Sequence, residues 1–182
     1  MIFKPMPLDG AFQIDLEKLT DTRGFFARLF CTKEFAALGL ASEWAQCNTS
    51  YNKVKGTLRG LHFQRPPMAE AKVVRCLKGG IFDVIVDLRA GSSSFGEWAS
   101  IELTEDNRTM VYIPPGFGHG FQTIASNTEI LYFHSKPYSP ADEGGLRFDD
   151  PKLKVTWPLP VANLSPRDGT HPYLEALKPI AI

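Results

Sequence analysis

A series of short segments rich in β-branched and aromatic residues recurs along the chain, and residues typical of turns separate them. The segments span residues 25–31, 44–51, 57–64, 71–77, 81–88, 97–104, 109–113, 118–124 and 128–134. Tight turns are predicted at Lys78-Gly79-Gly80 and at Glu105-Asp106-Asn107. Many short strands at close spacing predict an all-β fold, an antiparallel sandwich or barrel, with the jelly roll as the favoured subtype.

Helical pattern is sparse. We expect one short helix capped by Thr32 and ending near Gly39, and another within residues 172–177. Residues 137–166 are rich in Pro, Gly and Asp, and we expect them to wrap the outside as loops. The chain has 182 residues, of which 43% are hydrophobic, and no internal repeat or long linker divides it. Residues 1–182 are therefore expected to form one domain around one core.

Composition narrows the classes of partner. The 20 basic and 20 acidic residues balance, so nucleic-acid and membrane binding are not expected, while a few local cations can still hold a small anion. The N-terminal residues lack the apolar core of a signal peptide, and the most apolar segment, residues 81–88, is too short to span a bilayer. Three cysteines, none in a C-x-x-C pair, indicate free thiols and a cytoplasmic protein.

The segment 57–64 carries the first candidate for chemistry. Residues two apart on a strand share a face, so one face is expected to hold Leu58, Gly60, His62 and Gln64. Arg59 would point the other way, unless Gly60 marks a bulge that re-aims a neighbour. An imidazole directed into a sheet interior suits a pocket in which a proton moves near neutral pH.

Two interpretations of His62 remain open on these grounds. It can be a core histidine that bonds to a backbone carbonyl. Alternatively, Arg23, Arg59, Lys72 and Tyr132 lie in segments that can border the same cavity. A base together with several cations suits an anionic substrate and a developing oxyanion.

His119 follows a Pro-x-Gly turn, in a spacing similar to the second motif of cupin barrels, where this histidine often binds a metal. The first cupin motif needs His-x-His followed by Glu, whereas this chain has Gln64 two residues after His62. A stable metal site needs at least three suitable ligands, so no catalytic metal is expected. The Pro-Gly segment is also expected to form a tight turn that leads into a strand.

The remaining candidates have an ordinary and a chemical interpretation. Asp168 is a loop aspartate by default, but it can orient an imidazole and raise its basicity if its loop folds over the barrel mouth. Tyr132 and Tyr138 are a strand aromatic and a turn aromatic, although a phenol opposite a histidine suits a general acid. His134 and His171 have no comparable neighbours and are expected to be structural or surface residues.

Motifs over nearly the whole chain occur in the order of one known family. They are Asp21-x-Arg23-Gly24, Gln46-x-Asn48, residues 56–64, Lys72, residues 83–89, Phe95-Gly96, residues 115–120, Tyr132, Asp150-Pro151, Trp157-Pro158 and Ser165-x-x-Asp168. On these motifs the sequence resembles the dTDP-4-dehydrorhamnose 3,5-epimerase family, and its Arg59-Gly60-Leu61-His62 core is specific. The resemblance implies a cupin-like jelly roll, a homodimer, and an isomerase that acts on a nucleotide-diphosphate sugar without a cofactor.

The resemblance also implies catalytic roles. His62 would remove a proton from a carbon next to the C4 ketone of the sugar, and Asp168 would support His62. Lys72 would stabilise the enolate oxygen. Tyr132 would return a proton from the opposite face, which inverts the carbon.

Binding roles follow from the same resemblance. Arg59 and His119 would help to hold the sugar nucleotide, and Arg23 would meet the diphosphate across a subunit interface. The nucleotide and sugar pocket would be lined by Gln46, Asn48, Tyr138 and Glu143. Arg167 stands where relatives often carry Lys.

The chemistry agrees with these residues, because a ketone acidifies both adjacent carbons and one pocket can then invert C3, C5 or both. The sequence shows no dinucleotide fingerprint. Other functions remain open: a mono-epimerase, a ketoisomerase, a metal-dependent cupin oxygenase, or a catalytically silent sugar-binding protein.

Arg28 departs from the family pattern, since relatives that act on thymidine nucleotides usually have Glu there. Thymine presents an N3–H donor, which suits a carboxylate, whereas cytosine presents an N3 acceptor, which suits an arginine. A substrate with a different base, such as a CDP sugar, is therefore one hypothesis. The other is that Arg28 turns outward or pairs with a neighbouring carboxylate.

Overall fold

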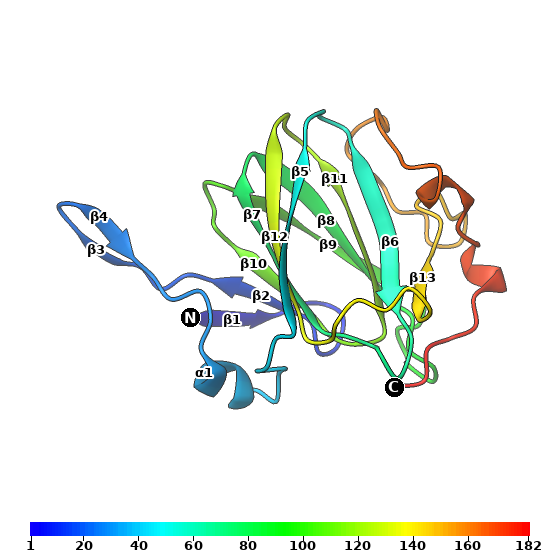
Figure 1. The fold of residues 1–182 in the computed structure, drawn as a ribbon, viewed down its shortest axis with the longest axis horizontal. Coiled ribbons are helices and arrows are strands. Elements are labelled where there is room, and N and C mark those ends of the chain that lie inside the picture. Colours follow the sequence, from blue (N-terminus) through cyan, green and yellow to red (C-terminus); the bar gives the residue numbers. More distant parts are fainter.

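Two antiparallel sheets dominate the computed structural model, which describes residues 1–182 (Figure 1). The first sheet has the strand order β1 (Ile2–Pro5), β2 (Phe12–Asp15), β10 (Met110–Ile113), β7 (Lys72–Lys78), β12 (Thr128–His134) and β5 (Gln46–Asn52). The second has the order β13 (Glu143–Gly145), β6 (Leu58–Gln64), β11 (Phe117–Thr123), β8 (Gly80–Asp87) and β9 (Trp98–Thr104). The sheets face each other as a cupin-like jelly-roll barrel, which confirms the predicted all-β fold.

The interior of the barrel is an apolar core to which both sheets contribute. Val74 and Ile130 of the first sheet and Ile85 and Leu103 of the second are buried in one cluster. Burial of such side chains stabilises the fold by about 1.5–3 kcal/mol each. Tyr132 packs against this cluster at its edge, so the core also fixes one wall of the cavity described below.

The predicted strand segments are confirmed to within two residues, apart from residues 25–31, where only β4 (Gly24–Phe26) forms. Four further strands, β1, β2, β3 (Leu19–Asp21) and β13, were not predicted, because three or four residues are too few for alternation to be recognised. Helix α1 (Thr32–Ala36) follows an N-cap at Cys31 without a side-chain hydrogen bond, so the expected Thr32 cap is wrong. Two single turns of 3-10 helix, η1 (Asp168–Thr170) and η2 (Leu174–Ala176), lie near the C-terminus.

Gly60 forms the bulge that the sequence allowed. On β6 and β11, His62 pairs with His119, but Arg59 pairs with Phe121, so β6 has one extra residue between these pairs. The φ of Gly60 is 118°, and a Cβ there would lie 2.7 Å from the carbonyl oxygen of His119. Only glycine fits this close approach. The extra residue turns Arg59 toward the same cavity as His62.

The C-terminal segment covers the outer face of the second sheet (Figure 1). Leu61 and Phe63 point outward from β6 and pack in one cluster with Leu153, Leu177 and Ile180. This packing brings η1 against β6. Residues 137–166 lie outside the barrel as expected, although three of them pair with β6 as β13.

The β3–β4 hairpin projects away from the barrel (Figure 1). Its Leu19 and Phe26 are 68% and 72% exposed.

No helix in the structure has the length and apolar character that a membrane span requires.

Candidate active site

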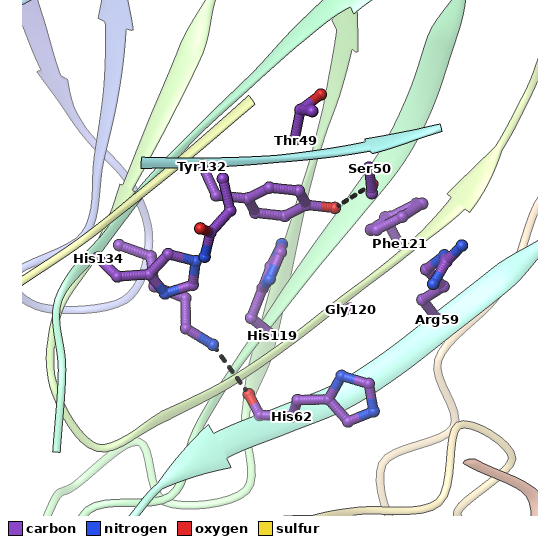
Figure 2. A pocket seen from close by; sticks show the side chains of 11 residues that line it. Thr49, Ser50, Arg59, His62, His119, Gly120, Phe121, Tyr132 and His134 are labelled. Atoms are coloured by element: carbon purple, nitrogen blue, oxygen red, sulfur yellow. Dashed lines mark hydrogen bonds between the residues drawn. The ribbon is translucent and has the colours of Figure 1, made fainter. Parts of the chain in front are cut away.

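A cavity of about 250 Å³ lies between strands of the two sheets (Figure 2). Strands β5, β6, β7, β11 and β12 supply its lining, which consists of Asn48, Thr49, Ser50, Arg59, His62, Lys72, His119, Gly120, Phe121, Tyr132 and His134. A second hollow of about 190 Å³ adjoins it and shares His62 and Lys72 with it. Gln46, Tyr138 and Glu143 line this second hollow.

His62 and Asp168 form a hydrogen-bonded pair, with 2.7 Å between Nε2 and Oδ1. The backbone N–H of Asp168 donates to Ser165 Oγ at 3.0 Å, which fixes the aspartate in η1. Burial raises the pKa of Asp168, but the hydrogen bond and charge of His62 outweigh it, and the net pKa is lowered. An ionised Asp168 accepts the Nε2–H of His62 and leaves the other ring nitrogen free to act as a base.

Tyr132 projects from β12, on the other side of the cavity from His62 (Figure 2). Its hydroxyl lies 2.9 Å from Ser50 Oγ, and its ring stacks on that of His134 at a centroid distance of 6.0 Å. Burial raises the pKa of the phenol, and the hydrogen bond with Ser50 offsets only part of this. Tyr132 is therefore protonated near neutral pH and can donate a proton.

Lys72 supplies a cation at the cavity wall. Its Nζ lies 3.5 Å from the carbonyl oxygen of His62 and 3.4 Å from Glu70 Oε1. The other oxygen of Glu70 lies 3.0 Å from Nδ1 of His134. Glu70 thus holds Lys72 and His134 together, and an ammonium in this place can stabilise an oxyanion in the cavity.

His119 is held by a buried aspartate. Its Nε2 lies 2.8 Å from Oδ2 of Asp83 on β8, and burial raises the pKa of Asp83. Gln64, at the place of the second histidine of the cupin metal motif, donates to the carbonyls of Met68 and Pro137. This side chain therefore holds the loop that follows β12.

Four of the predicted binding residues contact one another beside the second hollow. Tyr138 donates its hydroxyl to Glu143 Oε2 at 2.6 Å, and Arg167 Nη2 lies 2.6 Å from the same oxygen. The backbone N–H of Tyr138 donates to the side chain of Gln46. Arg59 Nε donates to Asn52 Oδ1 at 2.7 Å. Gln46, Tyr138, Glu143 and Arg167, here called the polar entrance, supply hydrogen-bonding groups beside the second hollow, and Arg59 adds a cation to the wall of the first cavity.

Comparison with known proteins agrees with this architecture. The family model described as dTDP-4-dehydrorhamnose 3,5-epimerase matches residues 5–176. The chain belongs to this family. A dTDP-4-dehydrorhamnose 3,5-epimerase of Sinorhizobium fredii is 39% identical over 179 residues, which cover 96% of this chain and 90% of the relative.

Two Streptomyces proteins are equally similar to this member of the epimerase family. A dTDP-4-dehydrorhamnose 3-epimerase of Streptomyces niveus is 40% identical over 169 residues, 92% of this chain and 81% of the relative. The crystal structure of NovW from Streptomyces spheroides, a 4-keto-6-deoxy sugar epimerase, has a TM-score of 0.90 and 39% identity. That match covers 96% of this chain and 88% of NovW.

Two predicted binding residues lie away from the cavity in this epimerase-family chain. Arg23 lies in the turn between β3 and β4, where its Nε donates to Asp21 Oδ2 at 3.1 Å. Arg28 Nη1 donates to Glu34 Oε1 at 2.7 Å, and Glu34 also binds the amino group of Met1. The contact of Arg28 matches the hypothesis of a neighbouring carboxylate.

Sequence reasoning missed other residues of the site. His134 was expected to be structural or a surface residue, but it lines the cavity, and its position two residues after Tyr132 on β12 was a usable signal. His171 was expected to be the same, but it lies against Asp168. Ser50 and Glu70 were not singled out, since a lone Ser or Glu carries no pattern of its own.

Asp168→Asn should lower kcat about tenfold or more, because a neutral amide no longer fixes the imidazole tautomer.

The lowered pKa of Asp168 also makes the stability of the protein depend on pH. Its contribution is complete above about pH 5 and is lost as the pH falls below about 4. The difference in free energy of unfolding between wild type and variant, measured by urea titration, should therefore shrink on acidification. A difference that grows toward low pH would contradict this assignment.

Proposed function

We propose that the protein converts dTDP-4-dehydro-6-deoxyglucose into dTDP-4-dehydrorhamnose by inverting C3 and C5. One observation carries the proposal: a carboxylate-supported imidazole and a protonated phenol line one cavity from opposite sides. Membership of the epimerase family supports the same reaction.

The reaction is a proton transfer at each carbon next to the ketone. The ring nitrogen of His62 that does not contact Asp168 takes the proton, and the C–H electron pair moves into the C4 carbonyl to form an enolate. The ammonium of Lys72 stabilises the enolate oxygen. Tyr132 then donates its hydroxyl proton to the opposite face of the carbon, and exchange with solvent restores both side chains.

Substrate binding involves the polar entrance. Arg59 and His119 hold the sugar nucleotide beside the base, while Gln46, Asn48, Tyr138, Glu143 and Arg167 line the path that leads to it. Support comes from their positions: Arg59 and His119 line the cavity, Gln46, Asn48, Tyr138 and Glu143 line the adjoining hollow, and Arg167 contacts Glu143.

The proposal is tested by incubating the enzyme with dTDP-4-keto-6-deoxyglucose in heavy water and following each carbon by NMR. Deuterium at C3 and C5 with inversion of both carbons is the expected result. Deuterium at one carbon would identify a mono-epimerase, the activity in the name of the Streptomyces niveus relative. No exchange at either carbon would overturn the proposal.

The pairing of Arg28 with Glu34 leads to an expectation for the nucleobase. Because this arginine is neutralised by a carboxylate of its own chain, it is not free to select cytosine. We expect kcat/KM for the dTDP sugar to exceed that for the CDP and UDP sugars by about tenfold or more, which corresponds to about 1.4 kcal/mol. A preference for the CDP sugar would show that Arg28 binds the base.

We also infer a homodimer in the cytoplasm. The exposed apolar residues of the β3–β4 hairpin favour contact with a second copy, which would let Arg23 reach a partner's cavity. Light scattering after gel filtration measures the assembly.

The cytoplasmic location is supported by the odd number of cysteines, of which Cys76 is a buried thiol.

A further inference from the structure

His171 lies beside the paired His62 and Asp168 and is not among the residues that line the cavity. Its Nε2 is 3.7 Å from Asp168 Oδ1, and its ring meets that of His62 edge to face at a centroid distance of 5.7 Å. The ring packs directly on the backbone of Gly145, where any Cβ would overlap it. Gly145 itself pairs with His62 across β13 and β6, so the two histidines are held by adjoining strands.

The Nε2 atom of His171 is buried and has no hydrogen-bond partner. The side chain is only 11% exposed. A buried polar nitrogen without a partner is unfavourable, and few such groups occur in native structures. This nitrogen, next to a carboxylate and a second imidazole, is placed to share a ligand with them.

The three side chains present the donor set of a transition-metal site. One donor atom from each of His62, Asp168 and His171 lies within 4.8 Å of the other two. Two imidazoles and one carboxylate are typical zinc ligands, at about 2.0–2.2 Å from the ion, which separates tetrahedral ligand atoms by about 3.3 Å. The observed separations from Asp168 Oδ1, 2.7 Å to His62 and 3.7 Å to His171, lie on either side of this value. Small side-chain shifts therefore suffice for coordination.

We propose that His62, Asp168 and His171 bind a divalent transition metal of the zinc class, and that the bound metal inhibits the enzyme. A metal on Nε2 of His62 displaces the proton from that nitrogen. The ring must then carry its proton on Nδ1, which leaves no lone pair to accept a proton from a sugar. Binding stands on the geometry alone, whereas inhibition rests on the proposed role of His62 as the base.

The test of binding uses the untagged, chelator-treated full chain and Co²⁺ or Zn²⁺ alone. Wild type should bind one ion per chain, and the visible spectrum of Co²⁺ should show nitrogen and oxygen ligands. His171→Ala should weaken binding at least about tenfold, since loss of even an outer partner of a ligand costs 10–100-fold. His134→Ala, which removes a histidine of the cavity outside the cluster, should bind as wild type does. Thermal unfolding checks that each variant is folded.

A variant that gains a spectroscopic signal complements the variants that lose metal binding. His171→Cys should restore a site and add a thiolate-to-Co²⁺ absorption band that wild type lacks. Equal affinity of wild type and His171→Ala would overturn the proposal. A thiolate band in wild type would do so as well, because it would place the ion on Cys31 or Cys47.

Inhibition is measured by the loss of deuterium exchange as Zn²⁺ is added. The half-inhibitory concentration, normalised to each variant's own rate, should rise at least about tenfold in His171→Ala. Binding at His171 without any loss of exchange would overturn the inhibitory half of the proposal. Absence of exchange even in chelator-treated wild type would instead overturn the proposed epimerase function and leave the metal site intact.

Discussion

His62→Asn should abolish deuterium exchange at C3 and at C5 together, with a loss of about 10²–10⁴-fold in kcat. Asparagine keeps a polar side chain in the cavity but has no basic nitrogen, so neither carbon can lose its proton. NMR in heavy water measures both sites at once. Loss of exchange at only one carbon would contradict the assignment of a single base.

The loss of activity in His62→Asn must be distinguished from a loss of folding. The side chain of His62 is about one-third exposed and belongs to neither of the apolar clusters that hold the second sheet, so the replacement leaves this packing in place. The Tm should therefore fall only by as much as the lost contact with Asp168 contributes, and binding of dTDP, followed by calorimetry, should persist. An inactive variant that also fails to fold would say nothing about proton transfer, and these two measurements separate the cases.

Tyr132→Phe should separate exchange from inversion. His62 can still remove and return a proton on its own face, so deuterium should enter the substrate. Without the phenolic proton, delivery to the opposite face should fall about 10²-fold or more. The product ratio in the NMR spectrum measures this. Rapid inversion by the variant would show that another group donates the proton.

Ser50→Ala is the matched control for Tyr132. This variant removes the 2.9 Å hydrogen bond to the phenol but keeps the phenol itself. Inversion should therefore continue at a reduced rate, and the reduction should be smaller than in Tyr132→Phe. Equal losses in the two variants would mean that the orientation of the ring, and not its hydroxyl proton, limits the reaction.

The sequence predicted most of the barrel because its long strands carry a clear composition and are bounded by turns. It also indicated the bulge, since Gly60 interrupts an otherwise regular strand. The shortest strands were missed because three or four residues do not define a period. The strands β2 and β13 depend on pairing with distant segments, which no local pattern reports.

The sequence indicated those site residues that lie within a predicted strand or a specific motif. His62, Lys72 and Tyr132 belong to that group, and all three line the cavity. The contact of Asp168 with His62 joins residues 106 positions apart, so the sequence allowed it only on the condition that the loop folds over the barrel, and the resemblance to a family made it an expectation. His171 could not be placed at all, because its position depends on the path of the C-terminal segment over Gly145.

The outer layer formed by the C-terminal segment has a consequence for biosynthesis of the enzyme. All the strands of the barrel precede residue 146, whereas the carboxylate that contacts His62, the proposed base, is residue 168. A ribosome-bound chain can therefore complete both sheets while its imidazole still lacks its aspartate. Leu153, Leu177 and Ile180 must dock before His62 meets Asp168, so under the proposed mechanism catalytic competence is the last property that the nascent chain acquires.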